Sequence, residues 1–232
     1  MLTRRRFIFL RHGETDWNRE RRMQGNTDTP LNATGLAQAG EAAALLRGRG
    51  ITTIATSPLI RARTTAEIVG RSLGLDPVVV PDLREANWGP LEGQLRDHRF
   101  DAWRTDGLTP PGAERYADFI ARALSGINTA LALPAGPAAG APDRAPARCG
   151  PPGRAGRRTR GGRAFRPGRR RGGGGGGGGG PILIVAHGGV YRSVLAHAGW
   201  RRDGGLPNCR PILHEPPAED GNAWRAVELT GS

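Results

Sequence analysis

The sequence predicts a single α/β domain built on a mostly parallel, doubly wound sheet with helices on both faces. Three observations support this prediction. Strand-like and helix-like segments alternate along the chain, as in a parallel sheet covered on both sides. The best-defined strand-like segments, 7–10 and 182–185, are apolar at every position, as expected for strands buried on both faces. The length of 232 residues is sufficient for one sizeable core.

Four short segments are expected to form the parallel part of the sheet. Each is rich in apolar or β-branched residues. In chain order the expected strands are residues 7–10, 53–56, 78–80 and 182–185. The segment 208–229 is expected to add further strands, but its internal prolines leave their register open.

Capping and terminating residues mark the first two helices. Asn32 can cap a helix that runs through an alanine-rich stretch to about residue 47 and ends at Gly48. Pro58 is suited to the first turn of a second helix, which reaches about residue 73. Both helices follow strand-like or turn-like sequence, which keeps the alternating order.

Three further helices are expected later in the chain. Apolar side chains at helical spacing predict a long helix over 113–133, with one face toward the core. Shorter helices are expected within 96–104 and over 190–198. The last of these directly follows the strand 182–185, as in a strand–helix unit of a parallel sheet.

The segment 134–180 interrupts this pattern. It is almost wholly Gly, Ala, Pro and Arg, and it holds eleven arginines and one aspartate, or +10 of the formal net charge of +13. Such a composition predicts a disordered insertion into a domain formed by residues 1–133 and 181–232. An arginine- and glycine-rich segment can also bind nucleic acid, which is an alternative of another functional class. We favour an expanded or frame-shifted stretch without a function, since these four residues have G/C-rich codons.

The cysteine content and the hydropathy of the sequence indicate the cellular compartment in which the protein is expected. The two cysteines, Cys149 and Cys209, have no paired spacing, so neither a disulfide framework nor a metal site is predicted. No apolar run approaches the roughly 20 residues that a membrane helix needs. The sequence therefore predicts a cytoplasmic protein without a membrane partner.

Two histidines directly follow predicted strands. His12 comes after the strand 7–10, and His187 comes after the strand 182–185; each is followed by glycine. In open parallel sheets, ligands bind beyond the carboxyl ends of the strands. If the two strands are neighbours, both imidazoles lie at the same edge of the sheet and can act on one ligand.

Five ordered motifs surround these histidines. They are LRHGET at residues 10–15 with WN at 17–18, QG at 24–25 with DTPLNATG at 28–35, TSPLIRA at 56–62 with TA at 65–66, LRE at 83–85 with WG at 88–89 and LEG at 91–93, and VAHGG at 185–189. Together they resemble the histidine phosphatase superfamily, in its phosphoglycerate mutase-like branch. The resemblance extends over about residues 5–133 and 181–230, and it implies a phosphoglycerate mutase-like fold.

The resemblance implies a phosphohistidine mechanism. His12 would attack phosphorus as a neutral imidazole, with its other ring nitrogen donating to a backbone carbonyl. Arg11 and Arg61 would bind the oxygens of the phosphate dianion, for which the planar guanidinium is well suited. His187 would donate a hydrogen bond to the phosphoryl group. These residues supply the positive charge, so no metal and no cofactor are expected.

The same resemblance points to a proton donor and to a substrate mouth. Glu85 would act as general acid for the leaving alkoxide and then as base for water, with Glu14 and Glu92 as rival donors. Together with Arg11 and Arg61, the residues expected to line the substrate mouth are Thr15, Asn18, Gln24, Gly25 and Gly188.

Phosphatase and mutase share the first chemical step. A mutase must also hold a second phosphorylated acid and exclude water, which in the mutases is the task of a long basic segment after the acid motif. Here the segment 96–111 is short and of mixed charge. We therefore expect a phosphatase that acts on a small phosphorylated metabolite, with a cofactor-dependent phosphoglycerate mutase as the alternative. Nucleic acid is not an expected partner, and a homo-oligomer is left open.

Overall fold

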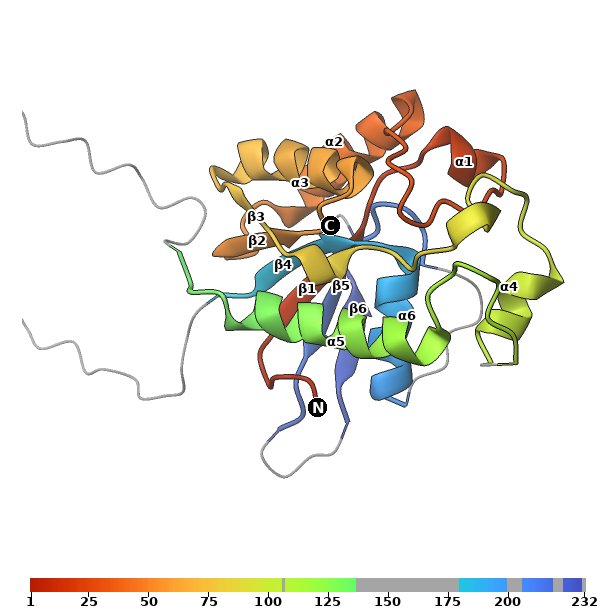
Figure 1. Cartoon of the computed structure of the whole chain (residues 1–232). Helices are drawn as coiled ribbons and strands as arrows, with labels where there is room; N and C mark the ends of the chain where they lie inside the picture. The colour runs from red at the N-terminus through yellow and green to blue at the C-terminus, as the bar shows by residue number, and fades with distance from the viewer. Residues whose placement is uncertain (106, 137–179, 200–205, 219–222, 231–232) are drawn as a thin grey trace, which may run out of the picture. The chain divides into compact units, whose positions relative to one another are not determined.

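The computed structural model describes residues 1–105, 107–136, 180–199, 206–218 and 223–230. These residues form a six-stranded sheet with the strand order β3-β2-β4-β1-β5-β6 (Figure 1). The strands are β1 (Phe7–Arg11), β2 (Thr53–Thr56), β3 (Pro77–Val79), β4 (Ile182–Ala186), β5 (Ile212–Glu215) and β6 (Arg225–Glu228).

The first four strands are parallel and the last two are antiparallel. β4 lies between β1 and β2, and Phe7 of β1 and Thr53 of β2 both pair with Ile182. β5 pairs antiparallel with β1, and β6 pairs antiparallel with β5. The prediction of a mostly parallel sheet is confirmed, and the two C-terminal strands extend it at one edge.

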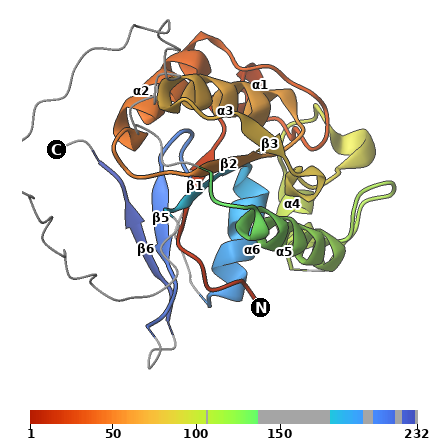
Figure 2. The same cartoon turned by 90° about the vertical axis from the view of Figure 1, so that its left-hand side faces the viewer.

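Helices cover both faces of the sheet. The α-helices are α1 (Asp16–Arg19), α2 (Ala33–Leu46), α3 (Ile60–Leu73), α4 (His98–Trp103), α5 (Tyr116–Ala132) and α6 (Gly188–His197), and the short 3₁₀ turns are η1 (Pro81–Leu83) and η2 (Gly89–Leu91). α2 and α3 pack on one face, and α5 and α6 pack on the other (Figure 2). Within the described part of the chain, no helix combines the length and apolar character needed to cross a membrane.

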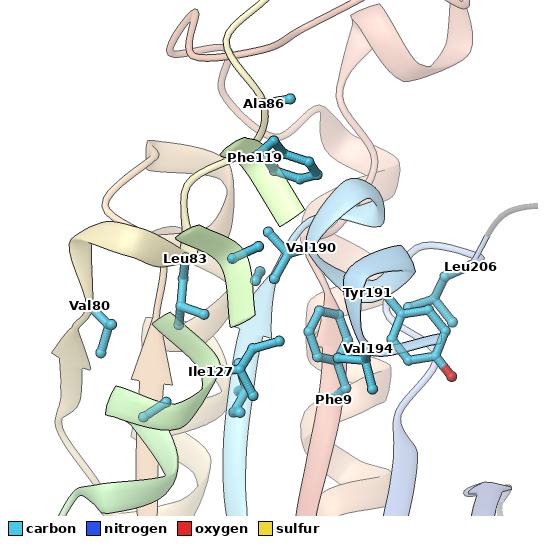
Figure 3. Packing of buried hydrophobic residues seen from close by; sticks show 14 of the residues in the cluster. Phe9, Val80, Leu83, Ala86, Phe119, Ile127, Val190, Tyr191, Val194 and Leu206 are labelled. Carbon is cyan, nitrogen blue, oxygen red and sulfur yellow. The ribbon is translucent and has the colours of Figure 1, made fainter. Parts of the chain in front are cut away.

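The alternation of side chains along the central strands divides the core in two. On β1, Phe7 and Phe9 belong to the cluster formed with α5 and α6, whereas Ile8 and Leu10 belong to the cluster formed with α2 and α3. Figure 3 shows Phe9 beside side chains of α5 and α6. Burying one such side chain stabilises the fold by about 1.5–3 kcal/mol. The uniformly apolar sequence of residues 7–10 is explained by this burial on both faces.

Two predicted helix starts differ from the structure. Pro58 lies before α3, whose first residue is Ile60, because the free amide of Ile60 is capped by the carboxylate of Asp28. The long helix α5 starts at Tyr116 instead of 113, because the backbone of Glu114 bonds to Asn87 in the preceding loop. Both starts are set by contacts with distant residues, which the local sequence does not reveal.

The one-turn helix α1 was not predicted. Thr15 caps it: its hydroxyl accepts from the amide of Asn18, and the Asn18 side chain accepts from the amide of Thr15. This reciprocal capping is a recognisable sequence signal. The helix was not predicted because a single turn is too short to show an apolar periodicity.

Both ends of the predicted insertion meet at the start of β2. Thr53 donates to the carbonyl of Pro134, and the amide of Thr52 donates to the carbonyl of Pro181. Figure 1 shows the end of α5 and the start of β4 away from α1 and α4. Of the segment 134–180, only 134–136 and 180 are described, so its predicted disorder lies outside the described residues.

Candidate active site

The carboxyl ends of β1 and β4 bring the two motif histidines together. The amide of His12 donates to the carbonyl of Ala186 at 3.0 Å, so the two strands are joined up to the residue before His187. The ring centroids of His12 and His187 are 5.2 Å apart, with the planes inclined by 57°. Both side chains are buried. The sheet order therefore produces the juxtaposition that the sequence predicts.

The surroundings of His12 fix its charge and its tautomer. Burial and then the charges of Arg61 and Arg11 lower the pKa of His12 well below its usual value, so the imidazole is neutral at neutral pH. Nδ1 lies 2.7 Å from the carbonyl oxygen of Gly13. Because a carbonyl only accepts, Nδ1 carries the proton and Nε2 keeps its lone pair. This is the form of histidine that can act as a nucleophile.

Two arginines supply positive charge beside this ring. Arg61 is 1% exposed and donates to the carbonyls of Gly25 and Thr27. Arg11 donates to the carbonyl of Leu206. Burial lowers the pKa of each guanidinium to about 10, which leaves both charged at neutral pH. The Nε atoms of both are buried and have no hydrogen-bond partner among the described residues, and an oxyanion would satisfy them.

His187 has one bonded and one unbonded ring nitrogen. Its Nε2 lies 2.7 Å from the hydroxyl of Ser57, and its Nδ1 is buried without a partner among the described residues. Burial and then the charge of Arg61 lower the pKa of His187 well below its usual value. If the Ser57 hydroxyl donates to Nε2, the proton of the neutral ring is on Nδ1, which has no acceptor among the described residues.

Glu85 lies at the amino end of α6. Its carboxylate accepts from the amide of Gly189 at 3.0 Å and from the amide of Ala86 at 3.1 Å. A side chain at position 189 would collide with this carboxylate, so a glycine is required there for the close approach. The glycine pair after His187 therefore orients the predicted acid.

An ion pair from α5 holds the loop that carries Glu85. Arg122 pairs with Glu114 at 2.7 Å, and their side chains are only 12% and 17% exposed. The same guanidinium donates to the carbonyls of Asp82, Arg84 and Glu85. Three bonds to one short segment limit how far that segment can move.

The two rival acids both accept hydrogen bonds from neighbouring residues. The carboxylate of Glu92 accepts from the amides of Asn26, Thr27 and Trp88, and it thereby ties the Gly25 loop to the acid loop. The carboxylate of Glu14 accepts from the side chain of Asn32. Glu14 lines the cavity together with Glu85, whereas Glu92 does not.

A cavity of about 600 Å³ opens over His12. Eight of the predicted site residues line it, namely Arg11, His12, Asn18, Gln24, Gly25, Arg61, Glu85 and Gly188. His187 packs against the ring of His12 but does not contribute to the lining. Thr15 does not contribute either: it is fully buried and its hydroxyl caps α1, so it positions Asn18.

A model of the histidine phosphatase superfamily (branch 1) matches residues 7–138. The chain belongs to this superfamily. The match covers the motifs with His12, Arg61 and Glu85 and ends before the motif with His187, which the structure nevertheless brings to the same site.

Curated relatives of this histidine phosphatase are similar over its N-terminal part. A probable phosphoglycerate mutase GpmB of Escherichia fergusonii is 41% identical over 137 residues, which is 55% of this chain and 63% of that protein. A probable phosphoglycerate mutase GpmB of Yersinia enterocolitica is 40% identical over 139 residues, covering 56% and 65%. The matched part of this chain therefore spans less than two thirds of the length of these relatives.

Solved structures are similar over nearly the whole chain. Mycobacterial hydrolase 1 is 27% identical with a TM-score of 0.68, covering 98% of this chain and 99% of that chain. TTHB049 from Thermus thermophilus is 29% identical with a TM-score of 0.63, covering 97% and 99%. Phosphoglycerate mutase from the same organism is 29% identical with a TM-score of 0.62, covering 98% and 99%.

These findings give no support to a nucleic-acid-binding module. The superfamily match covers residues 7–138, which carry three of the site motifs. The arginine-rich segment behind the nucleic-acid hypothesis lies outside the described residues.

Several residues of this histidine phosphatase site were not predicted. Asn208 donates to the carbonyl of His12 at 2.7 Å, and Arg96 and Arg192 line the cavity. Ser57 lies inside a motif quoted for Arg61 and could have been found from it. The other three lie outside the quoted motifs, and only the packed fold brings them to the site.

Proposed function

We infer that the chain is a phosphomonoester hydrolase that acts on a small phosphorylated metabolite through a phosphohistidine at His12. The observation that carries this proposal is the state of His12: a buried, neutral imidazole whose Nδ1 proton is held by Gly13, beside two charged guanidiniums with unbonded Nε atoms. A neutral nucleophile next to fixed positive charge suits the attack on a phosphate dianion.

The chemistry proceeds in two balanced steps. Nε2 of His12 attacks phosphorus, the bond from phosphorus to the ester oxygen breaks, and the Glu85 carboxyl gives its proton to the leaving alkoxide. Water then attacks the phosphohistidine and gives its proton to Glu85, and the P–N bond breaks to release inorganic phosphate and neutral His12. Arg11, Arg61 and His187 donate to the phosphoryl oxygens in both steps.

A phosphoglycerate mutase is the second candidate. It is favoured by the names of the relatives, which are called probable phosphoglycerate mutases. It is disfavoured by the short segment between η2 and α5, whose described residues form a single six-residue helix, α4. The two reactions differ in whether water or a second phosphorylated acid accepts the phosphoryl group from His12.

Trapping of the phosphoenzyme tests the proposal. We expect mass spectrometry after an alkaline quench with p-nitrophenyl phosphate to find the phosphoryl group on His12. His12→Ala should lower kcat/KM by at least about 10³-fold, while His197→Gln, a change outside the cavity, should retain activity. Full turnover by His12→Ala would remove the nucleophile assignment.

An acceptor assay separates the two candidates. Phosphoglycerate is supplied with and without bisphosphoglycerate, and both inorganic phosphate and isomerised product are measured. Phosphate release that does not need bisphosphoglycerate supports the hydrolase. Isomerisation that depends on it, without phosphate release, supports the mutase.

A further inference from the structure

Two hydrogen bonds hold the peptide unit that precedes the Cα atom of His12. The carbonyl of Arg11 accepts from the amide of Cys209, and the amide of His12 donates to the carbonyl of Ala186, both at 3.0 Å. The second bond continues the pairing of β1 with β4. The first comes from the segment 206–209, which lies before β5 in the chain. This peptide unit is therefore held at both of its polar atoms.

The peptide unit that follows the Cα atom of His12 is held in the same way. Its oxygen accepts from the side-chain amide of Asn208 at 2.7 Å, and its nitrogen, the amide of Gly13, donates to the hydroxyl of Thr65 at 3.0 Å. The carbonyl of Gly13 in turn lies 2.7 Å from Nδ1 of His12. A rotation of this unit would displace that carbonyl, so Asn208 and Thr65 together fix the contact on which the tautomer of His12 depends.

The side-chain nitrogen of Asn208 contacts two residues of the site. A primary amide has two N–H donors. One is directed to the carbonyl of His12, and the nitrogen also makes a long contact of 3.5 Å with the side-chain oxygen of Asn18. That oxygen accepts in addition from the amide and the hydroxyl of Thr15. Asn208 thus connects the main chain of the nucleophile to a residue that lines the cavity, and it lines the cavity itself.

The backbone at Cys209 has a conformation that brings Asn208 to this place. Its φ is +51°, in the left-handed region, which a residue with a side chain adopts at a cost in free energy. The regular pairing of β1 with β5 ends before this point. Here the amide of Cys209 reaches Arg11 while the side chain of Asn208 reaches His12. A strained conformation of this kind persists only where its surroundings require it, and such conformations cluster at functional sites.

Attachment of the segment 206–209 to the fold does not require the bond from Asn208. The carbonyl of Leu206 accepts from the guanidinium of Arg11 at 2.6 Å, and the amide of Cys209 donates to the carbonyl of the same residue. The side chains of Leu206 and Cys209 are both buried. The bond from Asn208 therefore adds little to the anchoring of the segment, and its principal effect is on His12.

We propose that Asn208 is a positioning residue for the phosphoryl-transfer step. By holding the carbonyl of His12, it keeps the imidazole in the orientation from which Nε2 attacks phosphorus. This inference rests on the proposed function and deepens it at the same site. Asn208 takes no part in the chemistry, since no covalent bond to it forms or breaks. It acts through His12, because a nucleophile that is held in line reaches the reactive geometry more often.

The variant Asn208→Ala tests this role, because it removes both donors and introduces no charge. We expect the rate of His12 phosphorylation, measured by rapid quench in a single turnover of p-nitrophenyl phosphate, to fall by about 10- to 10²-fold. The affinity for inorganic phosphate, measured by competitive inhibition, should change little, because Arg11 and Arg61 keep the bonds of their guanidiniums. An unchanged rate overturns the proposal. An equal loss of rate and of phosphate affinity also overturns it, since Asn208 would then only maintain the shape of the site.

A matched control and a conservative variant accompany this measurement. Asn128 of α5 also donates from its side-chain amide to a backbone carbonyl, that of Met1 at 3.1 Å, and it is half-buried like Asn208 but does not line the cavity. Asn128→Ala should keep both the rate and the affinity. Asn208→Ser, whose hydroxyl can reach the carbonyl of His12 through one water, should recover part of the rate. If Asn208→Ala does not fold, the comparison of Asn208→Ser with the wild type carries the test.

Histidine NMR keeps the inference independent of turnover. In the free enzyme labelled with ¹⁵N-histidine, long-range correlations distinguish the two neutral tautomers, and His12→Ala assigns the signals of His12. We expect the Nδ1–H tautomer alone in the wild type and a mixture of tautomers in Asn208→Ala, because the contact with Gly13 is then no longer fixed. Identical spectra overturn the proposal, even where the wild type is phosphorylated and the hydrolase stands. The expected change of spectrum in an enzyme whose His12 is never phosphorylated would reject only the hydrolase.

Discussion

The reactivity of His12 depends on the residues that surround its ring. Burial and then the charges of Arg61 and Arg11 keep the imidazole neutral, and the carbonyl of Gly13 holds the Nδ1 proton. The neighbouring loop is fixed from two helices, since the amide of Gly13 donates to Thr65 of α3 and the amide of Glu14 donates to Gln38 of α2. A nucleophile whose ring cannot rotate loses less entropy when it attacks.

Glu85 is the residue for which the chemistry makes the sharpest prediction. Glu85→Gln keeps the size of the side chain and removes the transferable proton. We expect kcat/KM to fall by about 10²–10⁴-fold for alkyl phosphates, whose leaving group must be protonated, and much less for p-nitrophenyl phosphate, whose leaving group is stable as an anion. Steady-state kinetics on the two substrates measures the difference. An equal loss on both would assign the acid to another residue.

The motif residues could be predicted because each motif is local. His12 and His187 follow apolar strands and are flanked by glycine, so their place at the sheet edge can be predicted without the fold. Arg122 differs, because its role depends on a distant segment of the chain. Ser57 lies within a motif, but its partner His187 is 130 residues away and is not revealed by that motif. Arg192 belongs to the same group, because its position on α6 does not reveal that it lies close to Phe100 and Arg96 in the folded chain.

At the level of elements, α5 contributes more than core packing. Its apolar face was predicted from periodicity, and Phe119 and Ile127 are buried as expected. Its polar residue Arg122 holds the acid-bearing loop through three carbonyls and the pair with Glu114. The helix thus connects the core to the position of the proton donor.

Arg122→Met is predicted to impair catalysis through the position of Glu85. The variant keeps the apolar stem and loses the donors, so the acid shifts; a displacement of about 1 Å can cost 10²-fold. We expect a larger loss for alkyl phosphates than for p-nitrophenyl phosphate. A merely structural role would lower both equally.

Three further variants control this prediction. Arg115→Met removes an exposed arginine at the amino end of α5 and should change neither rate. Breaking a buried ion pair costs about 3–5 kcal/mol of stability, because one charge is left unpaired. The double variant Arg122→Met/Glu114→Gln leaves no unpaired charge, so an activity loss that it retains reflects the position of Glu85 and not destabilisation of the fold. Partial recovery in Arg122→Lys would support the bonds to the carbonyls.

The elements that the sequence predicts well are those with a long local signal. α2 starts after Asn32, whose side chain caps the amide of Gly35 as predicted. The presence of β5 and β6 could be expected from the sequence, but their pairing could not, because the prolines of this segment leave the register open. In the structure Phe7 lies opposite His214. Their antiparallel direction depends on which strands become neighbours in the sheet, and the sequence of a single segment does not reveal this.

At the level of the whole molecule, a buried histidine couples stability to pH. His214 is 0% exposed and stacks on Phe7 at 4.6 Å, and burial lowers its pKa to about 4. Below the ordinary value of 6.5 the unfolded chain binds a proton that the folded chain does not, so stability falls as the pH decreases from 6.5 toward 4.

His214→Leu is predicted to reduce this loss. At pH 5 the protonation of His214 in the unfolded chain lowers the free energy of unfolding by about 2 kcal/mol. The variant lacks this loss. Urea unfolding at neutral pH and at pH 5 measures the difference for both proteins. An unchanged loss in the variant would show that other groups govern acid unfolding.

Removal of residues 137–179 is predicted to leave catalysis intact. The remaining ends both contact the start of β2, and a shorter loop stabilises the fold by about 2 kcal/mol at most. We expect kcat/KM on small phosphates to be nearly unchanged. Loss of activity would place the segment in the site, and a salt-dependent gel shift that disappears on removal would support the nucleic-acid alternative.

The meeting of both flanks at Thr52 and Thr53 has a practical consequence. His12 and His187 follow the carboxyl ends of β1 and β4, whereas these flanks join the sheet at the opposite, amino-terminal edge. A foreign domain whose own termini are close together could be grafted between residues 136 and 180. A fluorescent tag placed there would follow the enzyme in a cell without obstructing its substrate.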